Sequence, residues 1–115
     1  MTELDDIKKT LATFAKDRDW EQFHSPKNLA MALSVEVAEI VEHFQWLNEE
    51  DTNTLTTEKR HAIAEEIADT QMYLLLLAEK LDVDIIQSVN QKITKNAEKY
   101  PIEKTKGSSK KYTEY

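Results

Sequence analysis

Two pairs of acidic residues recur in this chain with the spacing of one helical turn. Glu36 and Glu39 form the first pair, and Glu66 and Asp69 form the second pair 30 residues later. Side chains three residues apart project from the same face of a helix, about one turn apart. Four carboxylates on two neighbouring helices can converge on a hard divalent cation, which prefers oxygen ligands. The pattern therefore predicts a Mg²⁺ site, and Mg²⁺ in turn indicates phosphate chemistry.

Both acid pairs lie beside the apolar side of their helices. On a helical projection, the acids border two apolar stripes and do not oppose them. The first stripe comprises Leu29, Leu33, Val37, Ile40 and Phe44, and the second comprises Ile63, Ile67, Leu74, Leu77 and Leu81. Carboxylates next to a core are unfavourable unless a cation or basic side chains neutralise them. We favour a metal site, and a structural ion-pair network is the alternative.

Apolar periodicity and capping residues predict an all-α, four-helix-bundle-like protomer. The expected helices are, in order, Glu3–Asp17, Ser25–Trp46, one from a cap at Thr56 or Thr57 to about Leu81, and one from Asp84 to about Tyr100. Their starts carry capping signals, with Thr2 before the first helix and a Ser-Pro step at the second. We expect one domain over residues 1–101, including a polar loop at 47–56. The tail, 102–115, is rich in lysine and is expected to be flexible or ordered by a ligand.

The composition excludes several classes of protein. The 115 residues suffice for one domain, and the net charge of −7 argues against a protein that coats nucleic acid. The chain has no cysteine, which fits a reducing cytosol. Its acidic start lacks the basic-then-apolar order of a signal peptide, and no stretch approaches the roughly 20 apolar residues of a membrane span. We expect a cytoplasmic protein that binds neither membranes nor nucleic acid.

The expected third helix is apolar around most of its circumference, from Met72 to Leu77. The other helices are too few to cover such a helix, so we expect a homo-oligomer. A non-catalytic helical interaction module is the alternative from another class, but it leaves the repeated acid pair unexplained. A di-iron carboxylate bundle is a weaker alternative. It needs Glu-x-x-His on two helices, and His43 follows Glu39 by four residues instead of three.

Some polar and aromatic residues could bind a nucleotide beside the metal. Lys92, Lys95 and Lys99 lie roughly along one side of the fourth helix, with Asn96 among them. Lysines would neutralise phosphates, although a solvated helix face is the alternative. Trp20 precedes the first acidic helix and Trp46 lies at its end. Their rings could stack on a nucleobase, with core packing as the alternative.

The acid pairs and their surroundings resemble the MazG-like family of all-α nucleoside triphosphate pyrophosphohydrolases. The motif Glu36-x-x-Glu39 followed by Glu66-x-x-Asp69 resembles that family's metal-binding signature. Other segments resemble landmarks of its dCTP pyrophosphatase branch, in the same order along the chain. These segments are Arg18–His24, Phe44–Trp46, Glu65–Asp69, Tyr100-Pro101 and Lys111–Thr113. The similarity covers nearly the whole chain.

The resemblance implies a fold, an assembly, a reaction and roles for individual residues. The protomer would have four helices and assemble as a dimer or a dimer of dimers. It would cleave the α–β phosphate bond of a nucleotide, giving a monophosphate and pyrophosphate, with Mg²⁺ or with Mn²⁺ in its place. The implied metal ligands are Glu36, Glu39, Glu66 and Asp69. The implied nucleotide contacts are Trp20 and Trp46 as walls of the base pocket, Tyr73, Lys92 and Asn96, and Lys110, Lys111 and Tyr112 closing over the phosphates. Vertebrate relatives have a base-contacting histidine where this chain has Leu11, which implies a broader range of dNTPs.

Overall fold

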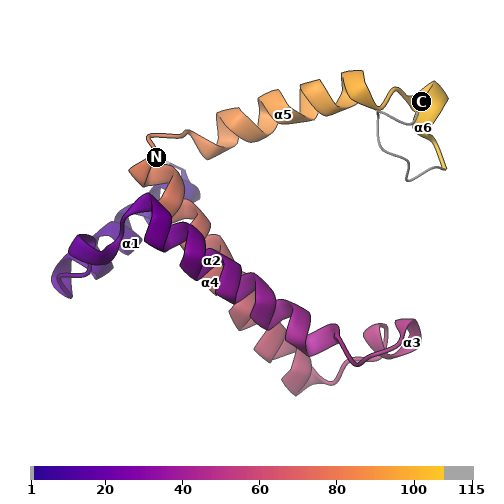
Figure 1. Ribbon diagram of the computed structural model, residues 1–115, viewed down its shortest axis with the longest axis horizontal. Helices are drawn as coiled ribbons and strands as arrows, with labels where there is room; N and C mark the ends of the chain where they lie inside the picture. Colours follow the sequence, from indigo (N-terminus) through magenta and orange to yellow (C-terminus); the bar gives the residue numbers. More distant parts are fainter. Residues whose placement is uncertain (1, 108–115) are drawn as a thin grey trace. The chain divides into compact units, whose positions relative to one another are not determined.

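Helices account for all the regular structure in the part of the chain that the computed structural model describes, residues 2–107. The chain divides into two units, Met1–Asp82 and Val83–Tyr115. The first unit contains α1 (Glu3–Asp17), the 3₁₀ helix η1 (Glu21–Phe23), α2 (Pro26–Phe44), α3 (Glu49–Thr52) and α4 (Thr57–Lys80) (Figure 1). The second contains α5 (Ile85–Lys99) and α6 (Ile102–Thr105).

The capping residues determine where the long helices begin. The hydroxyls of Thr2, Ser25 and Thr56 accept hydrogen bonds from backbone N–H groups in the first turns of α1, α2 and α4. The carboxylate of Asp84 does the same for α5, accepting from the Gln87 N–H at 2.9 Å. A side-chain acceptor at the N-cap satisfies one of the N–H groups that lack a partner inside the helix. The four long helices predicted from the sequence are therefore confirmed.

Two short helices lie where the sequence predicted a loop and an irregular tail. The segment expected to be a polar loop contains α3, which begins with a capping box between Asn48 and Asp51. The second short helix, α6, begins after Pro101 and occupies the start of the expected tail. In addition, α2 ends at Phe44, two residues before the predicted end. The capping-box hydrogen bonds explain why α3 forms, since such bonds stabilise a single helical turn without tertiary packing.

The core of the first unit lies where α2 and α1 pack against α4 (Figure 1). Leu29 of α2 and Leu75 of α4 are each only 1% exposed, and the remaining buried apolar residues are Ala15, Ile63 and Ala78. The segment 45–56, which contains α3, connects adjacent ends of α2 and α4, so these helices run antiparallel (Figure 1). This pairing places the two helices that carry the acid pairs side by side.

Several apolar residues that were expected to face the core are exposed in the single chain. In α4, Ile67 and Leu74 are exposed although they belong to the predicted stripe, and Ile86, Val89 and Ile93 of α5 are exposed as well. The α4 residues are exposed because α1 and α2 cover only part of the circumference of α4, as expected for a helix that the other helices of one chain are too few to cover. No helix in the described part of the chain is long and apolar enough to cross a membrane.

Thr56 is expected to stabilise α4 through its cap, whereas its neighbour Thr57 is not. The Thr56 hydroxyl accepts from the Lys59 N–H at 3.1 Å. Thr56→Ala should lower the free energy of unfolding by about 1 kcal/mol, since the Lys59 N–H loses its acceptor. Urea denaturation followed by circular dichroism measures this. Thr57→Ala is the matched control, and equal losses from both substitutions would contradict the assignment of the cap.

Candidate functional site

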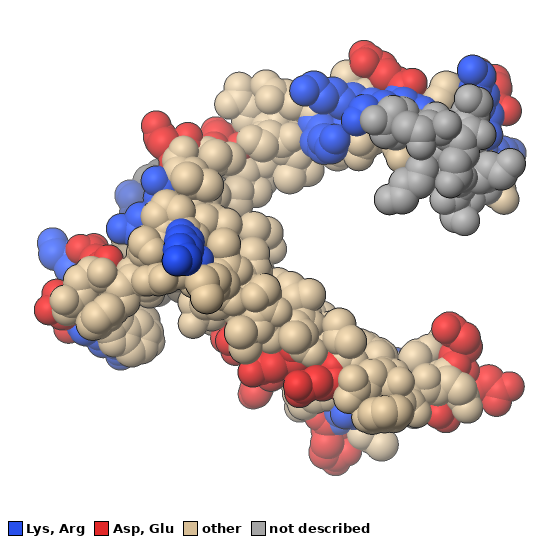
Figure 2. Space-filling model, viewed as in Figure 1, with Lys and Arg blue, Asp and Glu red and all other residues tan. Residues whose placement is uncertain are grey.

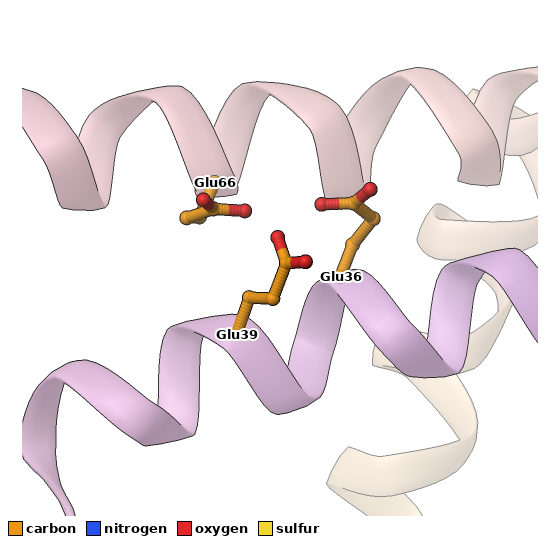
Figure 3. Close-up of side chains that lie close together, drawn as sticks. All are labelled: Glu36, Glu39 and Glu66. Carbon is orange, nitrogen blue, oxygen red and sulfur yellow. The ribbon is translucent and has the colours of Figure 1, made fainter.

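Three carboxylates from α2 and α4 converge in the space between the two helices. Glu36 and Glu39 reach this space from α2 and Glu66 reaches it from α4, with oxygens that all lie within 4.8 Å of one another (Figure 3). Because the helices are antiparallel, the second acid of the α2 pair faces the first acid of the α4 pair. The side chains form the one group of three or more potential metal ligands found among residues 2–107. Three of the four acids of the repeated Glu-x-x-acid motif thus form one cluster.

The three carboxylates are partly buried, and two of their oxygens lack a hydrogen-bond partner among the described residues. Oε2 of Glu36 and Oε2 of Glu66 are buried and have no hydrogen-bond partner among the described residues. A buried carboxylate oxygen without a partner is strongly unfavourable. Inward-facing oxygens of this kind fit the requirements of a divalent cation, which would coordinate them directly.

The electrostatics of the cluster are those of like charges held together. The pKa of Glu66 is raised to about 7, first because its protonated carboxyl can share the proton with Glu39, and then because of burial and the nearby Glu36. Burial also raises the pKa of Glu36; a hydrogen bond with Glu66 opposes this effect, and the carboxylates of Glu39 and Asp69 raise the pKa further. The groups that act on these two pKa values are themselves carboxylates. This finding argues against a structural ion-pair network, in which basic side chains would lower the pKa values.

Asp69 stands at the boundary between the carboxylate cluster and a neighbouring cavity. It raises the pKa of Glu36, so it lies close to the cluster, but it is not one of the three converging ligands. Instead it lines a cavity of about 500 Å³ together with Tyr73 of α4 and Trp20. A cavity of this size is typical of small-molecule sites. The carboxylates and the cavity are therefore adjacent parts of one candidate site.

The cavity is mainly apolar and aromatic, with polar groups at a few positions. It lies between α1, the segment around η1, and α4, and its other lining residues are Thr10, Leu11, Phe14, Ala15, His24, Met72 and Leu76. No binding role was predicted from the sequence for Phe14, His24 or Met72. A signal was available for Phe14, which lies one helical turn after Leu11 and shortly before Trp20. A mixed lining of this kind is typical of pockets that bind a flat organic ring.

Trp46 lies far from this cavity, and its predicted partnership with Trp20 is not seen within one chain. Trp46 is 87% exposed just beyond the C-terminal end of α2, whereas Trp20 precedes the start of that helix. The 19 residues of α2 span about 28 Å, which separates the two indoles. A single copy of the chain therefore does not bring both tryptophans to one pocket.

The remaining predicted nucleotide contacts lie in the second unit or beyond the described residues. Lys92 and Asn96 are exposed and one turn apart on α5, where Figure 2 shows a concentration of basic side chains. Figure 2 also shows acidic side chains gathered along the α2–α4 pair. Lys110, Lys111 and Tyr112 lie outside the described residues.

The alternative of a di-iron centre is not supported by the positions of the histidines. The sequence does contain two Glu-x-x-His segments, Glu21–His24 and Glu58–His61, which the prediction had overlooked. Glu21 is exposed in η1, and Glu58 and His61 are exposed in the first turn of α4. Neither segment contributes to the group of converging carboxylates. A di-iron centre would need both motifs to face the same interior site.

Comparison with known proteins places the chain in a family. Residues 31–115 match the sequence model of the MazG-like family. The chain belongs to the MazG-like family. Both acid pairs, α2 from Met31 onward and all of α4 fall within the matched region, and membership of this family together with the acidic cluster indicates a divalent metal ion.

Proteins similar to this chain include several that are named pyrophosphatases. The chain is 42% identical over 113 residues to dCTP pyrophosphatase 1 of Mus musculus and to dCTP pyrophosphatase 1 of Homo sapiens. Each alignment covers 96% of this chain and 66% of the relative, so the chain spans just under two thirds of the length of these proteins. The fold is similar to the crystal structure of a pyrophosphatase from Archaeoglobus fulgidus, with a TM-score of 0.83 and 35% identity, covering 88% of this chain and 94% of that one.

Proposed function

We propose that this chain is a Mg²⁺-dependent nucleoside triphosphate pyrophosphohydrolase. It cleaves the α–β phosphate bond of deoxynucleoside triphosphates, with dCTP and modified dCTP preferred, and releases a monophosphate and pyrophosphate. The observation that carries the proposal is the cluster of three carboxylates with uncompensated oxygens beside a cavity of about 500 Å³. The activities named for the mouse, human and archaeal relatives support it. Removal of unwanted nucleotides from a cytoplasmic pool is the biological role that fits this chemistry.

The residues of the first unit divide the work of the reaction. Glu36, Glu39 and Glu66 would hold Mg²⁺, and Asp69 would complete the set from the cavity side. When bound, Mg²⁺ neutralises phosphate charge, orients the triphosphate and lowers the pKa of an attacking water. One carboxylate of the cluster accepts a proton from the attacking water. The oxygen of that water bonds to phosphorus, and the bond between this phosphorus and the pyrophosphate leaving group breaks. Lys92, Asn96, Lys110, Lys111 and Tyr112 keep the role of nucleotide contacts that the resemblance to the family implies for them.

The base of the nucleotide occupies the cavity, where Trp20 and Tyr73 supply aromatic walls. Stacking on such rings is sequence-tolerant because every base has a π-face. Trp46 acts as a further wall, and the length of α2 then requires that it come from a second copy of the chain. The exposed apolar residues on α4 and α5 provide the surface for this homo-oligomer, a dimer or a dimer of dimers.

The test of the proposed function is product analysis with each common NTP and dNTP in the presence of Mg²⁺. Equal amounts of monophosphate and pyrophosphate are expected, and the order of rates gives the base and sugar preference. Orthophosphate as the product would indicate a different phosphatase reaction. If no nucleotide, modified or unmodified, gave a product, the alternative of a non-catalytic interaction module would be favoured.

Leu11 is expected to broaden the range of accepted bases. It lines the cavity but has no hydrogen-bonding group in its side chain. It therefore cannot distinguish the donors and acceptors on the edge of a base that faces it. Leu11→His should raise the ratio of kcat/KM for dCTP over dTTP by roughly tenfold, because an imidazole distinguishes donor from acceptor edges. Leu11→Met, which keeps an apolar side chain of similar size, is the control. Equal selectivity in the two variants would show that the base does not face residue 11.

A further inference from the structure

Three planar groups contact one another at the C-terminal end of α1. The guanidinium carbon of Arg18 lies 3.4 Å from the centroid of the Phe14 ring and 6.0 Å from the centroid of the Trp20 ring. The two rings meet edge to face, with centroids 5.7 Å apart and an interplanar angle of 65°. A cation within about 6 Å of an aromatic ring is attracted to its π-face. Arg18 therefore interacts with both rings.

The chain reversal after α1 fixes the backbone of Trp20. The N–H of Trp20 donates to the carbonyl of Ala15 at 2.9 Å, and the N–H of Asp19 donates to the carbonyl of Lys16 at 3.0 Å. These two bonds form a Schellman motif, whose left-handed position is occupied by Asp19 with a φ of 56°. The motif commonly places the residue after the reversal against the last turns of the helix, here Trp20 against Phe14. It determines where the indole starts, but not how the ring is turned.

The orientation of the indole depends on side-chain contacts, and Arg18 supplies one of them. Nη1 of Arg18 donates to the carbonyl of Phe14 at 3.1 Å, which ties the guanidinium to the end of the helix. Burial alone does not hold the rings, since Phe14 and Trp20 are each 45% exposed. Both rings line the cavity beside Asp69, whereas Arg18 is not among its lining residues. Arg18 therefore contacts two residues of the cavity wall without itself lining the cavity.

We propose that Arg18 is a positioning residue, which holds the Trp20 indole in the orientation that forms a wall of the nucleotide cavity. This inference rests on the proposed function, because it assigns the cavity to the base of the substrate. Arg18 acts as a planar group stacked on Phe14 and does not act as a charge that binds phosphate. These two roles predict different effects of substitution.

Steady-state kinetics of the full chain distinguish the two roles. Arg18→Ala should raise the KM for dCTP by roughly threefold to tenfold while kcat stays within about twofold, as expected for lost ring positioning. The affinity for dCMP should fall by the same factor, and inhibition by pyrophosphate should be unchanged. Arg18→Lys keeps the charge but loses the planar group. Its KM should therefore be only slightly lower than that of Arg18→Ala and should remain well above the wild-type value. Lys16→Ala removes another exposed cation from the last turn of α1 and is the control, with no change expected.

A spectroscopic measurement tests the same proposal without turnover. Trp46→Phe leaves Trp20 as the single tryptophan, so near-ultraviolet circular dichroism and fluorescence anisotropy then report on this indole alone. Adding Arg18→Ala should weaken the indole dichroism and lower the anisotropy, and adding Lys16→Ala should not. Phe14→Leu should produce a similar loss, and combining it with Arg18→Ala should add little, because both act through one stack. This second variant keeps the test valid if Arg18→Ala does not fold.

The outcomes separate this proposal from the proposed function. Full rescue by Arg18→Lys, or weaker inhibition by pyrophosphate in Arg18→Ala, would assign Arg18 to phosphate binding and overturn the positioning role. An active enzyme with unchanged KM and unchanged indole signals in Arg18→Ala would overturn it as well. A wild-type chain that neither hydrolyses nor binds nucleotides would refute the proposed function and, with it, the link between Trp20 and substrate.

Discussion

Glu39→Gln is expected to lower the kcat for nucleoside triphosphate hydrolysis by at least about a thousandfold, with the helices intact. Glu39 is the central member of the cluster, since its carboxylate acts on the pKa values of both Glu36 and Glu66. Glutamine has nearly the same shape but no negative charge, so the cluster loses charge at the position where the cation should bind. The measurement is a Mg²⁺ titration of pyrophosphate release, with circular dichroism to verify the fold.

The control for Glu39→Gln is Glu42→Gln, one turn later on the same helix. Glu42 is exposed and is not one of the converging carboxylates, so its loss should leave kcat within about twofold. Asp69→Asn should also abolish turnover if Asp69 completes the ligand set from the cavity side. Retention of activity by folded Glu39→Gln protein would refute its role as a ligand. Retention by Asp69→Asn alone would limit the ligand set to the three carboxylates that converge.

Local sequence signals were sufficient to predict the long helices and the family. Each long helix begins at a residue whose side chain can accept a backbone hydrogen bond, and such caps depend on only three or four neighbouring residues. The resemblance to the MazG-like family is confirmed by the match over residues 31–115. The convergence of Glu36, Glu39 and Glu66 also followed from sequence, because the pairs border the apolar sides of two consecutive long helices, which were expected to pack together. Their role as ligands stays a prediction.

Features that depend on the register and length of packed helices could not be predicted in this way. The spacing of Glu66 and Asp69 is the same as that of Glu36 and Glu39, yet Asp69 lies outside the group of three. The register in which α2 and α4 pack against each other determines which acids converge. This register cannot be read from the spacing of the acids in the sequence. Likewise, aromatic residues at both ends of α2 suggested one pocket, but the length of that helix separates Trp20 from Trp46 within a copy. The apolar residues of α4 were expected to need cover from another subunit, and the single chain leaves several of them exposed.

Glu66→Gln is expected to stabilise the metal-free chain at alkaline pH and to remove most of its stabilisation by Mg²⁺. The pKa of Glu66 is about 7 in the folded chain and has an ordinary value of 4.5. Between these values the folded state holds a proton that the unfolded state has released, so this group's contribution makes stability fall as the pH rises. The contribution is fully present below 4.5 and is lost as the pH passes through about 7. Glutamine does not titrate, so the variant lacks this decline.

Mg²⁺ should reverse the order of the two proteins, because it binds the ionised carboxylates and displaces the proton. In chelator at about pH 8, the melting temperature of Glu66→Gln should exceed that of the wild type, because the repulsion of Glu66 by its neighbours is absent. In millimolar Mg²⁺ at the same pH, the wild type should gain stability by mass action and the variant should gain little. At about pH 5 the wild type should respond weakly to Mg²⁺, since Glu66 then retains its proton. Equal responses of both proteins to Mg²⁺ at alkaline pH would mean that Glu66 does not bind the ion, and Glu42→Gln should behave as the wild type throughout.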